Sequence, residues 1–281
     1  MTKFTLSAFA DEASPVFDLQ LEALKRNGIP LVEVRGVDGK GILSLTDEEL
    51  DTVCAKLAAA NIGVSAVGSP IGKISILDDF APHFEQFKRA VEIAKRFGTT
   101  RIRMFSFYMP QGEDPEHYFD EVVSRVSQMV DYAKANGVDC CHENEKGIYG
   151  DTLARVQKLH AAVPGLRCVF DPANYIQCGD DPAVNFEALA PIIDYMHIKD
   201  ALSADGTVVP AGEGDGSVPA ILKALYETDK PYILTLEPHL FDFSGLQNLQ
   251  DEALSHKRVY HTSDEAFDTA ASALQHILNS L

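Results

Sequence analysis

Short runs of apolar and β-branched residues alternate along the chain with longer stretches in which apolar residues recur every three or four positions. The short runs have the length and composition of buried strands, and the longer stretches have the period of amphipathic helices. No linker rich in Pro, Gly or Ser interrupts the alternation, so we expect one domain over residues 1–281. Strands are predicted within residues 4–10, 31–36, 63–70, 101–107, 138–145, 167–172, 195–200 and 232–238.

The stretches between these runs predict helices with one apolar face. Thr46 followed three residues later by Glu49 is a capping box, and Ser14-Pro15 is typical of a helix start. The glycines before early strands are expected to end helices; they are Gly28, Gly63, Gly98 and Gly137. The apolar faces are Phe17, Leu21 and Leu24; Leu50, Val53 and Leu57; Phe84, Phe87, Val91 and Ala94; and Phe119, Val122, Val126 and Val130.

About eight strand-helix repeats predict an α/β fold, a (β/α)8 TIM barrel, because right-handed crossovers of this kind close into a barrel. A doubly wound open sheet is the alternative. That fold normally has a glycine-rich phosphate-binding turn after its first strand. Residues 7–14, SAFADEAS, contain no glycine, which favours the barrel.

Composition limits the function. A hydrophobic content of 46% excludes a disordered or fibrous chain, and a net charge of −18 makes nucleic acid and anionic membranes poor partners. A small molecule is therefore the expected partner. The N-terminal residues lack the apolar core of a signal peptide, so a cytoplasmic location is expected. The five cysteines form no CxxC motif and are expected to be small buried hydrophobic residues.

Four side chains that can bind a metal each lie just past the apolar core of a predicted strand, at 137–141 (GVDCC), 166–170 (LRCVF), 194–196 (DYM) and 232–235 (YILT). They are Glu143, Asp171, His197 and Glu237. In a barrel of parallel strands the carboxyl ends meet at one face, where the chemistry of this fold takes place. Three carboxylates and one imidazole are a hard, oxygen-rich set that suits Mn2+, Mg2+ or Co2+, and Zn2+ is also compatible because it does not need cysteine.

Each of these residues has a plainer interpretation. Glu143 fits a surface carboxylate, Asp171 a turn residue before Pro172, His197 a core histidine and Glu237 a helix cap. Four such residues at corresponding places favour the metal site. Because side chains alternate along a strand, His142 is predicted to point away from Glu143, and we leave it out of the ligand set.

Four segments carry a resemblance to a known family: residues 143–152 (ENEKGIYGDT), 170–175 (FDPANY), 197–200 (HIKD, with GEGDGSVPAIL at 212–222) and 236–239 (LEPH). They resemble the xylose isomerase-like TIM-barrel superfamily, in its sugar phosphate isomerase/epimerase group, over nearly the whole chain. Ketose 3-epimerases, inosose-processing enzymes and endonuclease IV belong to this superfamily. The resemblance implies that the metal ligands Glu143, Asp171, His197 and Glu237 bind one divalent ion, with Mn2+ or Mg2+ expected first.

For the epimerases, the resemblance implies removal of a proton next to a carbonyl, formation of an enediolate and return of a proton. A Lewis acid on the carbonyl oxygen and two positioned carboxylates serve this chemistry. Glu143 and Glu237 are the predicted catalytic residues. We therefore expect a metal-dependent isomerase or epimerase that acts on a sugar or polyol.

The substrate is less well defined. Asn174 stands where ketose 3-epimerases have a histidine, and Leu202 and Ser203 stand where they have an arginine. Lys199, on the same strand face as His197, can supply the positive charge. Ketohexoses, other polyols, keto-inositols and ketosugars derived from glycosides remain open as substrates.

Further residues are predicted to contact the substrate: Glu145, His239 and Arg103. Lys73, Arg35 and Tyr149 are additional candidates for the pocket. For Arg35, pairing with an acid on the surface is the plainer expectation.

Other functions remain open. A lyase or dehydratase would use the same scaffold and differ only in its product. A nuclease of the endonuclease IV kind normally has more His and acidic ligands and basic loops, and a non-catalytic sugar-binding module would not need all four ligands.

The turn at 212–216 is expected to be structural, because Glu213 and Asp215 would repel a phosphate. A homo-oligomer is considered because Phe241, Phe243 and Leu246 offer an apolar contact, although these residues also suit packing on their own barrel.

Overall fold

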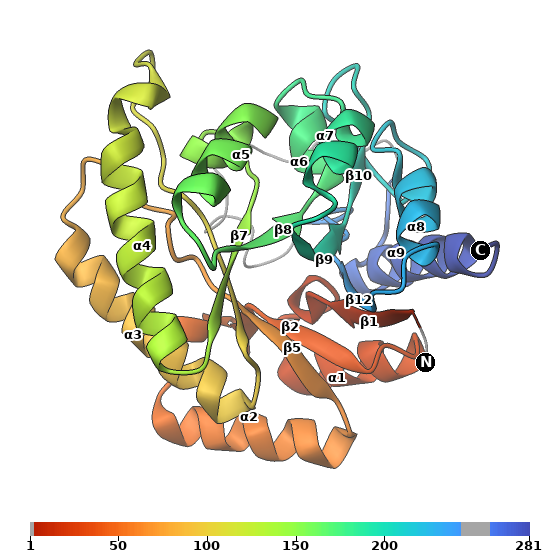
Figure 1. The fold of residues 1–281 in the computed structure, drawn as a ribbon. Helices are drawn as coiled ribbons and strands as arrows, with labels where there is room; N and C mark the ends of the chain where they lie inside the picture. Colours follow the sequence, from red (N-terminus) through yellow and green to blue (C-terminus); the bar gives the residue numbers. More distant parts are fainter. Residues whose placement is uncertain (1–2, 243–258) are drawn as a thin grey trace.

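The computed structural model describes residues 3–242 and 259–281, and an eight-stranded parallel sheet curled into a barrel lies at its centre (Figure 1). The strand order is β1-β12-β9-β8-β7-β6-β5-β2, and the end strands β1 and β2 are in contact. All eight predicted strands are present, and the predicted (β/α)8 TIM barrel is confirmed. The barrel strands are β1 (Phe4–Ala8), β2 (Leu31–Val34), β5 (Gly63–Gly68), β6 (Arg101–Met104), β7 (Asp139–Glu143), β8 (Arg167–Phe170), β9 (Ile193–Ile198) and β12 (Tyr232–Leu236).

Helices surround the barrel in Figure 1, so that the outward face of the sheet is covered. The α-helices are α1 (Phe17–Arg26), α2 (Asp47–Ala60), α3 (Phe80–Phe97), α4 (Phe119–Ala135), α5 (Leu153–Ala162), α6 (Pro172–Gln177), α7 (Pro182–Leu189), α8 (Val218–Tyr226) and α9 (Ser263–Leu278). Within the described residues, short 3-10 helices cover Ala10–Glu12, Ile42–Ser44, Pro115–Tyr118 and Tyr149–Asp151. Small hairpins pair β3 (Gly36–Val37) with β4 (Lys40–Gly41) and β10 (Asp200–Ala201) with β11 (Val208–Val209).

Most of the predicted helix ends are confirmed. Thr46 and Glu49 form the reciprocal capping box of α2. Two predictions were wrong. Gly63 is the first residue of β5, and α2 ends instead at Asn61, whose left-handed φ of 55° an asparagine tolerates. Ser14 does not cap α1, because Val16 occupies the N-cap position and the Ser14 hydroxyl accepts the Val16 N–H.

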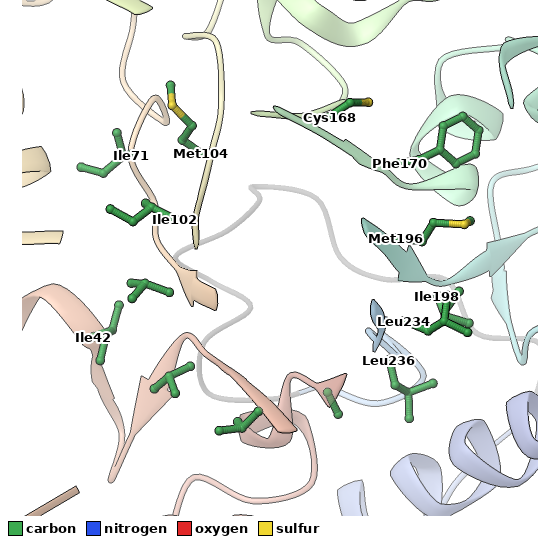
Figure 2. Close-up of a cluster of buried hydrophobic side chains, with 14 of the residues drawn as sticks. Ile42, Ile71, Ile102, Met104, Cys168, Phe170, Met196, Ile198, Leu234 and Leu236 are labelled. Atoms are coloured by element: carbon green, nitrogen blue, oxygen red, sulfur yellow. The ribbon is translucent and has the colours of Figure 1, made fainter. Parts of the chain in front are cut away.

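The barrel strands alternate between two environments. Side chains such as Ile102 and Met104 of β6, and Met196 and Ile198 of β9, point away from the barrel axis (Figure 2). They belong to the main apolar cluster between the sheet and the helices. The residues between them therefore face the interior, which places Arg103 and His197 inside the barrel.

The glycine turn after β11 is structural, as the sequence predicted. The backbone N–H groups of Gly212, Gly214 and Gly216 donate to the carboxylate of Asp200 over 2.9, 3.2 and 2.8 Å. A Cβ atom on Gly214 would lie only 2.3 Å from Asp200 Oδ1. A buried side chain of the protein itself thus occupies this anion-binding turn, next in sequence to Lys199.

The structure also bears on the cysteines, on membrane-spanning helices and on the apolar residues after the last strand. Cys140, Cys141 and Cys168 are buried, Cys54 and Cys178 are half-buried, and all five are free thiols. No helix among the described residues is long and apolar enough to cross a lipid bilayer. Phe241 packs against the barrel's apolar cluster, whereas Phe243 and Leu246 lie outside the described residues.

Candidate functional site

The four predicted metal ligands lie together at the carboxyl ends of four strands that are consecutive neighbours in the barrel, β7, β8, β9 and β12. His197 Nδ1 lies 2.9 Å from Glu143 Oε1 and 3.3 Å from Glu237 Oε2. One oxygen or nitrogen atom from each of Glu143, Asp171, His197 and Glu237 lies within 4.8 Å of all the others. At most 4% of any of these side chains is exposed, so the donor atoms converge in a site shielded from water.

Asp171 caps a helix and also faces the cluster. It is the N-cap of α6, where its Oδ1 atom accepts the Asn174 N–H over 3.0 Å. Its Oδ2 atom lies 2.9 Å from Lys199 Nζ, on the side of the site. The helix cap therefore fixes the carboxylate in position and leaves one oxygen directed into the cluster.

Asn144 is a site residue that the sequence analysis missed. Its side-chain amide donates to the Asp171 carbonyl and its oxygen accepts the Asp171 N–H, both over 3.0 Å. Asn174 Nδ2 donates to the Asn144 carbonyl over 2.8 Å and to Glu143 Oε1 over 3.3 Å. These contacts tie the ends of β7 and β8 together. The position of Asn144, directly after Glu143, was a signal that could have identified it.

Three buried cations contact the carboxylates. Arg103 Nη1 lies 3.1 Å from Glu143 Oε2, and Arg35 Nη1 lies 3.2 Å from Glu237 Oε1. Lys199 Nζ lies 3.3 Å from Glu237 Oε2. Surface pairing was the wrong expectation for Arg35, whose side chain is only 7% exposed. The reason is that Arg35 directly follows β2 and its side chain is directed toward Glu237, which follows β12.

Burial and the charged neighbours shift the pKa values of the acids in the site in different directions. Burial opposes ionisation of Glu143, but His197 and Arg103 lower its pKa below the ordinary value. Burial is likewise outweighed at Glu237, where Lys199, His239 and His197 hold the pKa well below the usual range. Burial dominates at Asp171 and raises its pKa to about 7 despite Lys199. In the metal-free protein, Glu143 and Glu237 are therefore the acids that stay ionised.

A second group of acids beside the site was not predicted. Glu12 lies after β1, and its Oε2 atom accepts the His239 N–H over 2.6 Å. Burial raises the pKa of Glu12 to about 8. Glu12, Glu237 and His239 together offer three atoms with the spacing of metal ligands, but Arg35 already contacts both Glu12 and Glu237. Asp11 and Glu12 directly follow the strand predicted within residues 4–10, so the rule applied to the other strand ends would have found them.

The remaining predicted residues occupy the rim of the site or lie outside it. Glu145 pairs with Lys73 over 2.7 Å, and the Lys73 ammonium lies 4.4 Å from the centre of the Phe105 ring. Tyr149 was considered for the pocket, but its ring packs on Phe119 and its hydroxyl donates to Glu116 over 3.1 Å. His142 is turned away from the ligands, as predicted, and its Nε2 atom lies 2.9 Å from Ser106 Oγ.

The arrangement fits a divalent cation. Three carboxylates and one imidazole converge in a buried cluster, and hard oxygen ligands with one nitrogen suit ions of the Mg2+, Mn2+ and Zn2+ type. Burying so much negative charge is costly unless cations compensate it, and Lys199 is shared between Asp171 and Glu237.

Comparison with known proteins agrees with the fold and adds a range of activities. Residues 21–259 match the sequence model of the family described as xylose isomerase-like TIM barrel. A 3-dehydroshikimate dehydratase of Bacillus anthracis is 23% identical over 203 residues, which cover 69% of this chain and 72% of the relative. A crystal structure of a probable 3-dehydroshikimate dehydratase from the same organism superposes with a TM-score of 0.74 at 19% identity, covering 98% and 99% of the two chains.

Two further solved structures share the fold. The structure of an IOLI protein with a bound zinc atom has a TM-score of 0.75 at 18% identity, covering 99% of both chains. That of an L-ribulose 3-epimerase has a TM-score of 0.75 at 17% identity, covering 100% of this chain and 95% of the other. The same barrel therefore carries an epimerase, a dehydratase and a zinc-binding protein.

Proposed function

Because the chain belongs to the xylose isomerase-like TIM barrel family, we propose that it is a divalent-metal-dependent isomerase or epimerase acting on a sugar or polyol. The observation that carries the proposal is the placement of Glu143 and Glu237. Their strands, β7 and β12, flank the strands that carry Asp171 and His197, and all four side chains converge. Two carboxylates thus approach one buried centre from two sides.

In the proposed function Glu143, Asp171, His197 and Glu237 hold one divalent ion, with Mn2+ or Mg2+ the first candidates. When bound, such an ion polarises the substrate carbonyl and makes the neighbouring C–H more acidic. Arg103 fixes Glu143 and Arg35 fixes Glu237, so each carboxylate has a defined orientation. Positioned in this way, one carboxylate removes the proton on carbon and the second returns a proton to the opposite face.

The substrate contacts follow from the same geometry. Lys199 and Asn174 are the proposed donors to hydroxyl and carbonyl oxygens of the substrate, Lys199 beside its contact with Asp171 and Asn174 by releasing its 3.3 Å contact with Glu143. His239 Nε2 lies 3.4 Å from Glu237 Oε1, Glu145 pairs with Lys73, and Arg103 contacts Glu143. A small polyhydroxylated carbonyl compound matches this polar lining better than an apolar ligand does.

A dehydratase is the second candidate, because a 3-dehydroshikimate dehydratase is similar in sequence and a probable 3-dehydroshikimate dehydratase has the same fold. Its chemistry begins in the same way. A glutamate takes the proton from the carbon next to the carbonyl, a double bond forms, and the hydroxyl on the next carbon leaves with a proton as water. The two reactions differ only in what happens after the first proton transfer.

The test is incubation of protein loaded with Mn2+ in D2O with a panel of ketoses, aldoses, inososes and 3-dehydroshikimate. Proton NMR follows deuterium incorporation and identifies the product. Glu237→Gln is the variant that removes one proposed base, and Asp205→Asn, on the exposed loop after β10, is the matched control.

An epimer or isomer that carries deuterium, formed by the wild type and Asp205→Asn but not by Glu237→Gln, supports the isomerase. An unsaturated product and water identify the dehydratase. Absence of exchange with every compound, from protein that binds one metal ion tightly, contradicts proton abstraction from these substrate classes.

A further inference from the structure

Glu33 is a carboxylate in the middle of the barrel that the proposed reaction does not use. It lies on β2, its side chain is fully buried, and the sequence analysis did not select it. The pairing of β2 with β5 shifts by one residue at this point, so that Val32 is opposite Val64 and Glu33 is opposite Ala66. Irregularities of this kind redirect side chains near functional sites. A buried acid at such a place needs an explanation.

Two hydrogen bonds from β9 reach Glu33 across the barrel interior. Tyr195 donates its hydroxyl to Glu33 Oε1 over 3.0 Å, and His197 Nε2 lies 3.3 Å from Glu33 Oε2. The two ring nitrogens of His197 therefore face different groups. Nε2 faces Glu33, whereas Nδ1 faces Glu143 and Glu237, two of the proposed metal ligands.

A histidine binds a metal through the lone pair of one ring nitrogen, and its other nitrogen then carries the proton and needs an acceptor. Packing limits the ring as well, because Phe9 and Tyr195 meet it edge-on at 5.1 and 5.6 Å between centroids. We propose that Glu33 is a positioning residue that accepts the Nε2 proton of His197 and thereby directs the Nδ1 lone pair at the metal. This inference rests on the proposed function, since it presupposes that the site binds a divalent ion.

A carboxylate is better suited to this role than an amide. It offers acceptors only, so it cannot donate to Nε2 and reverse the tautomer, whereas a glutamine can present its NH2 group to the same nitrogen. The negative charge also raises the basicity of the ring as a ligand. Carboxylate partners of this kind typically contribute a factor of about 10 to 100 in metal affinity.

The test measures the dissociation constants of Mn2+ and Zn2+ by competition with a chelator for the wild type, Glu33→Gln and Tyr195→Phe. Glu33→Gln keeps the shape but not the charge, and Tyr195→Phe removes the other hydrogen bond to the same carboxylate. We expect affinity to fall about 10- to 100-fold in Glu33→Gln. In Tyr195→Phe we expect a change of less than about threefold, because the contact with His197 is kept. Equal affinity of folded Glu33→Gln and wild type would overturn the inference, as would equal losses in both variants.

A second measurement uses the wild type alone and does not depend on whether a variant folds. In the Zn2+-loaded wild type, long-range 1H–15N NMR spectra of the histidine rings identify the protonated nitrogen of His197. A proton on Nε2 with the metal on Nδ1 is expected, and the reverse tautomer overturns the inference. If the wild type binds neither Mn2+ nor Zn2+, the proposed function itself is contradicted. This result is distinct from a wild type that binds metal while Glu33→Gln binds it equally well.

Discussion

Lys199 Nζ lies 2.9 Å from Asp171 Oδ2, so the ammonium group of the protein itself stands beside a proposed metal ligand. The two residues lie at the ends of neighbouring strands, and both side chains are at most 5% exposed. Neither charge has water to solvate it, so each depends on the other. Burial works against the charge on Lys199, but Asp171 and Glu237 raise its pKa above the ordinary value. The lysine therefore supplies a fixed positive charge at the floor of the site.

Replacing Lys199 with methionine is expected to destabilise the metal-free protein by about 3 to 5 kcal/mol, because it leaves buried carboxylates without their cation. Added Mn2+ should recover much of that loss, since it restores positive charge at the same oxygens. Thermal unfolding with EDTA and with excess Mn2+ measures both effects. An equal loss under the two conditions would show that the lysine and the metal do not share these carboxylates.

Gly68 is expected to tolerate no side chain. A Cβ atom there would lie 2.6 Å from the Phe9 ring, 3.3 Å from Arg35 Cβ and 3.4 Å from Arg103 Nη2. Gly68→Ala should therefore cost about 1 to 3 kcal/mol of stability and displace the arginines that hold Glu143 and Glu237. The control is Gly41→Ala, where a Cβ meets nothing within 4 Å and the backbone is extended. Denaturant unfolding and metal affinity compare the two variants, and similar behaviour of both would contradict the crowding.

Asp200 organises the loop after β9 through its carboxylate. Besides the three glycine N–H groups, it accepts the Ala201 N–H over 2.9 Å. In Asp200→Asn, an NH2 group would have to face N–H donors, and we expect a loss of about 2 to 4 kcal/mol from the charge-assisted hydrogen bonds. Asp205→Asn, which loses only a turn contact to Thr207, should cost less than about 1 kcal/mol. Urea unfolding distinguishes the two, and equal small losses would show that the glycine turn does not need the carboxylate.

Stability is expected to fall in mild acid because of His160 on α5. Burial lowers the pKa of His160 from its ordinary value of 6.5 to about 4. The unfolded chain then binds a proton that the folded chain rejects, so stability is full above pH 6.5 and declines as the pH falls toward 4. The shift corresponds to about 3 kcal/mol. Unfolding free energies measured from pH 7.5 to 4 should decline less steeply in His160→Gln, and parallel curves for variant and wild type would assign the decline to other groups.

The alternation of strand runs and amphipathic stretches was sufficient to predict the barrel, since each of the eight runs became a barrel strand. The reason is that burial on both faces selects short apolar segments that are easily read from a sequence. The same logic placed Glu143, Asp171, His197 and Glu237 at one end of the barrel. Their convergence in the structure agrees with that prediction. Their role as metal ligands remains a prediction.

The sequence by itself thus determined the fold and identified Glu143, Asp171, His197 and Glu237 as the candidate site, because both depend on position within a repeating strand-helix unit. Only the tertiary structure decided which partners these residues have. Glu33 and Arg35, on and just after β2, are far in the chain from His197 and Glu237, and closure of the barrel brings Arg35 to Glu237 and Glu33 to His197. The physical reason is that buried charges must find compensating groups nearby, and local sequence does not show which distant strand supplies them.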